Sequence, residues 1–147
     1  MKRLVPIAAA LLALCGCGNS GRDADIIAPP YVRLAAVPGR PAAAYLAVPI
    51  RGDRGALISV TAPRAARVEM HESMHAGTMA SMRPIARIPL RDGEMLAFSP
   101  GGRHLMLFGL DPAVRPGGQL RLVLNFEQGP PLPLDVAVIA AGGDALK

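Results

Sequence analysis

Short apolar segments, separated by breaks that contain proline or glycine, recur along most of this chain. Fifteen prolines and sixteen glycines among 147 residues leave little room for a long helix. The pattern predicts nine strands: Tyr31–Val37, Ala44–Val48, Leu57–Thr61, Arg67–Glu72, Ile85–Ile88, Met95–Phe98, His104–Leu110, Leu120–Phe126 and Leu134–Ala140. Many short strands at regular spacing indicate a single all-β domain, a sandwich or a Greek-key barrel.

Two of these segments alternate so that side chains with metal-binding chemistry share a face. In the strand predicted from residue 104, His104 and Met106 point one way, and the leucines that follow each of them point the other way. In the segment before residue 72, Glu69 and His71 likewise share a face. A His-x-Met pair on a strand therefore places an imidazole beside a thioether, with leucines anchoring the opposite face in the core.

The first residues, MKRLVPIAAALLALCGC, have the pattern of an export signal. Two basic residues precede an apolar run that is too short for a membrane span, and Gly16 stands before Cys17 as in a bacterial lipobox. We expect a lipoprotein signal peptide at residues 1–16 and lipid attachment to Cys17; an ordinary secretory signal is the alternative. Residues 17–30 would form a flexible tether, 31–142 the domain and 143–147 a short tail. The protein is thus expected in the bacterial periplasm, anchored to a membrane.

The charge pattern argues against nucleic acid as a partner. The chain carries a net charge of +5, but its arginines are scattered singly, and it has no tryptophan and only five aromatic residues. Nucleic-acid binding normally combines clustered basic residues with aromatic stacking platforms. Cys17 is the only cysteine after the predicted signal, so a soft-metal site in the folded domain must be built without thiolate ligands.

The segment VEMHESMHAGTMASMRP, residues 68–84, holds four methionines and two histidines and contains the zinc-peptidase pattern HExxH at His71, Glu72 and His75. That pattern needs a helix, which would bring the two histidines onto one face. The residues before His71 alternate as in a strand instead, and prolines interrupt the stretch that leads to Glu94, which would be the third ligand. A zinc peptidase is therefore a distant alternative.

Methionine is usually a core residue, and Met95, within EMLAF, is predicted to be one. Met74, Met79 and Met82 differ, because they lie in a segment rich in serine, glycine, alanine and histidine, which is a loop-like context. Thioethers are soft and uncharged, and together with imidazole they suit Cu(I) better than Zn(II), Ca(II) or Mg(II). They also avoid the disulfide chemistry that would disable a thiolate site after export.

The spacing of these residues resembles the signature of the bacterial PCu(A)C copper chaperones: a histidine, ten residues, a methionine, twenty-one residues, then His-x-Met. His71, Met82, His104 and Met106 match all four positions. The flanking segments VEMHE, MRPI and PGGRHLML match as well, and the resemblance covers roughly residues 31–140. Relative to many members, Met79 is displaced by one position, and the C-terminal AAGGDALK lacks the histidines and methionines of a second copper site.

The resemblance implies a cupredoxin-like β-barrel that binds Cu(I) at its surface through His71, Met82, His104 and Met106. It implies a copper carrier that supplies the dinuclear copper centre of cytochrome c oxidase, in subunit II, often alongside Sco-type proteins. We expect the carrier to be a monomer. His75 has no assigned role: it is expected to be exposed, and the alternatives are a weak extra ligand or a residue that supports a ligand. No nucleophile–base pair and no open catalytic metal position is evident, so an enzyme is not expected. A copper scavenger or buffer is the nearest alternative, and a metal-free structural lipoprotein is another.

Overall fold

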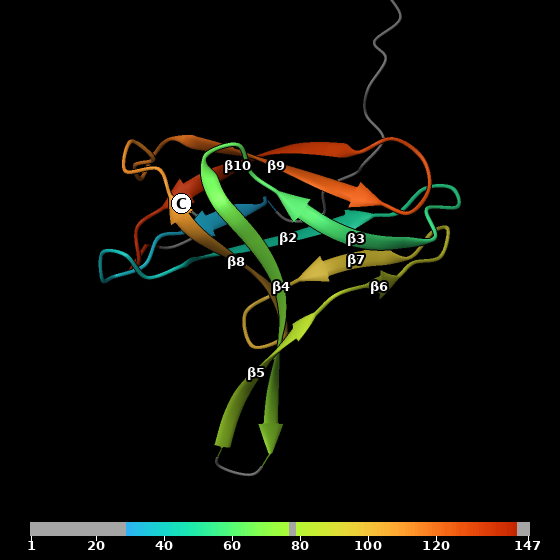
Figure 1. Cartoon of the computed structure of the whole chain (residues 1–147), viewed down its shortest axis with the longest axis horizontal. Coiled ribbons are helices and arrows are strands. Elements are labelled where there is room, and N and C mark those ends of the chain that lie inside the picture. The colour runs from blue at the N-terminus through green and yellow to red at the C-terminus, as the bar shows by residue number, and fades with distance from the viewer. Residues whose placement is uncertain (1–28, 77–78, 144–147) are drawn as a thin grey trace, which may run out of the picture.

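The computed structural model describes residues 29–76 and 79–143, and every regular element in them is a strand (Figure 1). The predicted all-β class and the single domain are confirmed. The predicted signal peptide and most of the predicted tether lie outside the described residues. The ten strands are β1 (Tyr31–Arg33), β2 (Ala42–Pro49), β3 (Ala56–Thr61), β4 (Ala65–Ala76), β5 (Met79–Ile85), β6 (Ile88–Pro89), β7 (Met95–Phe98), β8 (Arg103–Leu110), β9 (Gln119–Phe126) and β10 (Leu132–Ile139).

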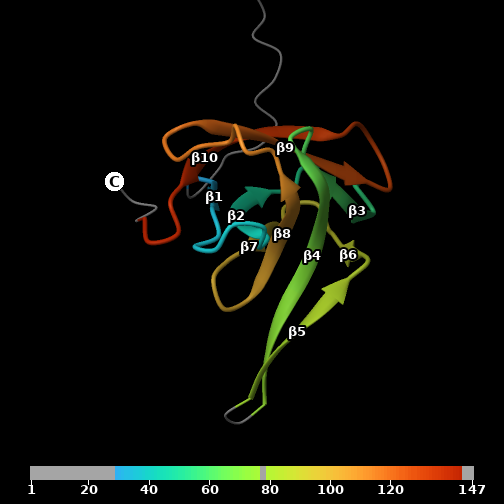
Figure 2. The same cartoon turned by 60° about the vertical axis from the view of Figure 1, so that its left-hand side comes forward.

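The strands form one strongly curled sheet. Within the sheet the strands lie side by side in the order β5-β4-β8-β2-β1-β10-β9-β3-β6. Strand β7 is outside this order and pairs with the second half of β2. β1 pairs with β10 in parallel, whereas the other pairings among the described strands are antiparallel. Because β3 and β4 are in contact across the curl, the sheet wraps around a single core (Figures 1 and 2).

Alternating burial along the strands builds this core. In β2 and β9, every second residue faces inward, which is the two-residue period of a half-buried strand. The same alternation in β8 buries Leu105 and Leu107 completely. The other large side chains with almost no exposure are Leu57, Leu96, Leu120, Leu122, Leu124, Val32, Val48, Val136 and Val138. The sequence-based assignment of two faces to β8 is thus confirmed.

The β4–β5 hairpin is the main departure from the sequence-based prediction. The context of Met74, Met79 and Met82 predicted a loop, but the structure continues β4 to Ala76 and pairs it with β5. The strand predicted over residues 85–88 is wrong, because Ile85 ends β5 and β6 begins only at Ile88. The hairpin projects beyond the body of the molecule (Figures 1 and 2).

Met95 is also placed differently from the prediction. It is exposed at the start of β7, where Leu96 and Phe98 take the inward positions of the alternating strand. The period of two therefore places Met95 outside, and its assignment to the core is wrong.

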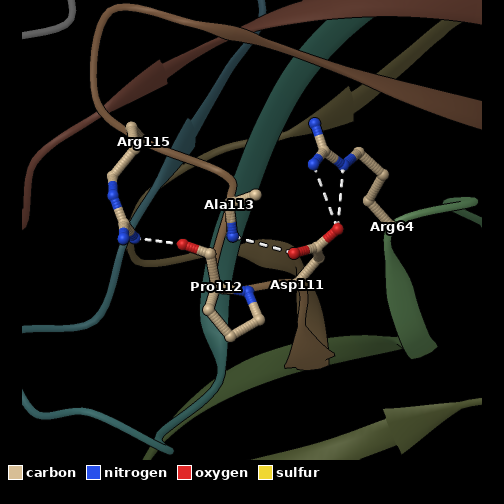
Figure 3. A network of polar contacts seen from close by, with 5 residues as sticks. All are labelled: Arg64, Asp111, Pro112, Ala113 and Arg115. Atoms are coloured by element: carbon tan, nitrogen blue, oxygen red, sulfur yellow. Dashed lines mark hydrogen bonds and ion pairs between the residues drawn. The ribbon is translucent and has the colours of Figure 1, made fainter.

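The β4–β8 pair is fixed at one end by a polar network around Asp111 (Figure 3). Two nitrogens of Arg64 donate to Asp111 Oδ2 at 3.0 and 3.2 Å, and the Ala113 amide donates to Oδ1 at 2.8 Å. Arg115 donates to the Pro112 carbonyl in the same loop. Gly109 lets β8 approach β4 closely, because a Cβ at this position would lie 2.7 Å from the Ala66 Cβ. Its φ of +59° is also a backbone conformation that glycine adopts without strain. These contacts hold β4 in register against β8.

Candidate metal centre

His71 and His104 lie directly opposite each other on β4 and β8. Their ring centroids are 6.0 Å apart and the rings are tilted by 31°. The His71 side chain is 14% exposed, and His104 is 7% exposed. Because metal–imidazole bonds are about 2 Å long, two rings at this separation are close enough to share one ion.

The two methionines of the signature lie on the same face as these histidines. Met106 is opposite Glu69, and Met82 is opposite Ser73 on the neighbouring strand β5. Opposite residues in an antiparallel pair point to one face, as do residues two apart on one strand. Ser73 and Glu69 each stand two residues from His71. Residues that are distant in sequence therefore meet on one face of β5, β4 and β8.

The four side chains differ in how deeply they sit. His104 is buried, Met106 is partly buried, and Met82 is 63% exposed on the projecting hairpin. The candidate donors thus run from the edge of the core out to solvent. This increase in exposure from His104 to Met82 leaves one side of the four candidate ligands accessible to another molecule.

Hydrogen bonds hold both imidazoles. The Nδ1 of His104 lies 3.1 Å from the Gly102 carbonyl oxygen, which is an acceptor, so Nδ1 is the donor and the lone pair of the neutral ring lies on Nε2. The Gly102 carbonyl also accepts from the Ser73 amide at 3.1 Å, which ties this loop to β4. The Nε2 of His71 lies 2.9 Å from Glu69 Oε2, whereas its Nδ1 is buried without a hydrogen-bond partner. An unpartnered buried nitrogen beside a second histidine fits a metal ligand.

Glu69 is ionised and paired. Its carboxylate accepts from Arg67 Nε at 2.7 Å, and Arg67 lies over the Phe108 ring. The hydrogen bond from Arg67, followed by that from His71, lowers the pKa of Glu69 below its ordinary value. Neither Glu69 nor Gly102 was predicted as a site residue, although the shared face of Glu69 and His71 was the available signal.

The opposite face of the same strands has different chemistry. Glu72 stands opposite both Arg83 and Arg103 and accepts from Arg83 at 3.0 Å. Met74 also lies on that face and is 43% exposed. Among the described residues, no group of three or more histidine, cysteine or acidic side chains could hold a metal ion.

The HExxH pattern lies within strand β4 and not on a helix. His71 and Glu72 consequently point to opposite faces of the sheet, so the arrangement that a zinc peptidase needs is not formed. The side chains of His75 and Met79 lie outside the described part of the structure, as does Cys17, and the predicted exposure of His75 stays a prediction.

Comparison with known proteins then places the chain in a family. The sequence profile of the family described as "Putative lipoprotein LpqE-like" matches residues 22–138. The chain belongs to this LpqE-like family. It is also 30% identical to the "Putative lipoprotein Lxx21020" of Leifsonia xyli subsp. xyli, over 92% of this chain and 88% of that protein. Both names describe lipoproteins, in agreement with the lipobox read from the sequence.

Solved structures share the fold of this LpqE-like chain. The apo PCuAC domain of PmoF2 aligns with a TM-score of 0.64 at 24% identity, covering 83% of this chain and 94% of that one. The copper-bound PCuAC domain of PmoF2 gives 0.61 at 23%, covering 81% and 94%. The Cu(I) form of DR1885 from Deinococcus radiodurans gives 0.58 at 24%, covering 84% and 83%. The resemblance to PCu(A)C domains, drawn first from spacing, is confirmed for the fold.

No helix long and apolar enough to cross a membrane occurs in the parts of the chain that the structure describes.

Proposed function

We propose that this protein is a Cu(I)-binding metallochaperone whose ligands are His71, Met82, His104 and Met106. The observation that carries the proposal is that three strands bring these four residues onto one face of the sheet. In sequence they are separated by ten residues, then twenty-one, then one.

The donor set favours Cu(I) over harder ions. Two imidazoles and two thioethers are neutral and soft, which suits Cu(I) and holds Zn(II) or Mg(II) poorly. The free lone pair of His104 Nε2 and the unpartnered Nδ1 of His71 would supply the nitrogen ligands. The copper-bound state of one PCuAC neighbour and the Cu(I) state of another support the same cargo for this chain.

Transfer to an acceptor is the role that the exposure of the site supports best. Met82 is largely exposed, so a partner's ligand could replace it first while the buried His104 still holds the ion. Lipid attachment at Cys17, with residues 17–30 as a tether, would keep the domain in the periplasm beside membrane-bound acceptors. The proposed acceptor is the dinuclear copper centre in subunit II of cytochrome c oxidase, reached directly or with a Sco-type protein. The protein would act as a monomer and carry out no catalysis.

A Cu(I) titration tests the metal assignment. We would use the chain as exported, with Cys17→Ser so that no thiol competes, and measure binding against the Cu(I) chelator bicinchoninate. One equivalent should bind, and His104→Ala or Met106→Ala should abolish uptake at chelator concentrations where the unsubstituted chain holds copper. Stoichiometric zinc binding with Glu72-dependent peptide hydrolysis would refute the proposal, and no metal uptake would leave a structural lipoprotein.

A further inference from the structure

A chain of side-chain contacts leads from the protein body to His71. The guanidinium carbon of Arg67 lies 3.9 Å from the centroid of the Phe108 ring, its cross-strand partner. Arg67 Nε donates to Glu69 Oε1 at 2.7 Å, and the other oxygen of Glu69 lies 2.9 Å from His71 Nε2. Each oxygen of this carboxylate therefore has its own partner, and the carboxylate is held at a defined place beside the imidazole.

This contact determines where the His71 proton resides. An ionised carboxylate can only accept hydrogen bonds, so His71 Nε2 must be the donor. A neutral imidazole with its proton on Nε2 has its lone pair on Nδ1. That Nδ1 atom is buried and has no hydrogen-bond partner among the described residues. The ring is thus held at Nε2, and its other nitrogen, Nδ1, keeps a lone pair that no described residue uses.

We propose that Glu69 is a positioning residue that makes Nδ1 the copper ligand atom of His71, an inference that rests on the proposed function. His104 is held the opposite way, because its Nδ1 donates to the Gly102 carbonyl and leaves Nε2 free. The two histidines would therefore bind one ion through different ring nitrogens. Partners of this kind, which fix the tautomer of a ligand histidine, commonly change metal affinity without touching the metal.

Glu72 offers a matched control on the same strand. It is also a partly exposed glutamate with an arginine partner, Arg83, at 3.0 Å. It lies on the opposite face, away from the imidazole of His71. Removing Glu72 costs the strand its ion pairs with Arg83 and Arg103, and removing Glu69 costs the ion pair with Arg67. Only the loss of Glu69 frees the His71 ring.

The experiment compares Glu69→Ala, Glu69→Gln and Glu72→Ala in the exported chain with Cys17→Ser. Imidazole ¹⁵N NMR of the metal-free protein should place the His71 proton on Nε2, and Glu69→Ala should yield a mixture of tautomers. Competition with bicinchoninate should show a loss of Cu(I) affinity of about ten- to a hundredfold for Glu69→Ala. Glu69→Gln should recover much of it, since its amide oxygen can accept the same proton, and Glu72→Ala should match the unsubstituted chain. Far-UV circular dichroism would establish that each variant is folded.

The outcomes separate this inference from the proposed function. If the unsubstituted chain takes up no Cu(I), the proposed function itself fails. If it binds copper but carries the His71 proton on Nδ1, or if Glu69→Ala binds copper as tightly as Glu72→Ala, only the positioning role of Glu69 is overturned.

Discussion

At the scale of single residues, Met82 and Met74 form a matched pair. Both are exposed on the β4–β5 hairpin, at 63% and 43%, and both carry the same soft sulfur. They differ in face: Met82 stands opposite Ser73 and shares the side of His71, whereas Met74 stands opposite Ser81 on the other side. The direction of a side chain, not its type, should decide whether it binds copper.

Met82→Ala should therefore weaken Cu(I) binding by at least about tenfold, which is the size of effect expected when a site loses a ligand or a key partner. Met74→Ala should leave affinity and stoichiometry unchanged. Competition against bicinchoninate measures both. Equal losses for the two variants would mean that the hairpin binds copper without regard to face.

At the scale of strands, the site depends on the register between β4 and β8. His71 lies six positions after Ala65, which is at the Asp111 end of this pair, and six steps span about 20 Å at the usual rise per residue. The network of Arg64, Asp111 and Ala113 closes the far end of the pair (Figure 3). A slip of one residue would turn His71 to the other face, so this distant clamp serves the site as well as the fold.

Acid should weaken this clamp. The Ala113 amide, followed by Arg64, lowers the pKa of Asp111 below its ordinary value. A carboxyl whose pKa is lower in the folded state adds stability above its unfolded pKa, about 4, and loses that contribution as pH falls through the lowered value. Asp111→Asn should therefore unfold at lower urea concentration than the unsubstituted chain at pH 7, and the difference should shrink below about pH 4.

Arg64→Gln provides the control for this experiment, because it keeps the larger cause, the Ala113 hydrogen bond. Its pH-dependent effect should be smaller than that of Asp111→Asn. Urea midpoints of unfolding between pH 7 and pH 2 would measure the effects of both substitutions. If the difference between Asp111→Asn and the unsubstituted chain stayed constant across this range, Asp111 would not be the titrating group.

At the scale of the whole molecule, the face that carries the four proposed copper ligands belongs to strands at one end of the curled sheet. The hairpin extends from a body whose core lies largely between the other strands (Figure 2). This arrangement exposes part of the site without opening the core. It suits hand-over to a partner better than deep storage.

Deletion of the protein distinguishes delivery from buffering. If the protein delivers copper as proposed, cells that lack the protein and grow at low copper should assemble cytochrome c oxidase without its dinuclear copper centre. Added copper should restore the centre, since a carrier matters most when its cargo is scarce. Spectroscopy of the purified oxidase measures this. A normal centre together with increased sensitivity to copper would instead indicate a scavenger.

The sequence by itself determined the all-β class, the two faces of β8 and the residues whose spacing matches the copper signature. These are local properties, because a strand's period of two and the chemistry of a side chain do not depend on distant partners. Only the tertiary structure decided that the His71–Met82 stretch forms a hairpin, that Met95 faces outward and that β1 runs parallel to β10. It also decided which nitrogen of each imidazole meets a hydrogen-bond partner, because Glu69 and the Gly102 carbonyl hold the rings through contacts that depend on where the backbone runs. Strand pairing and hydrogen bonding join residues far apart in the chain, and no local pattern encodes them.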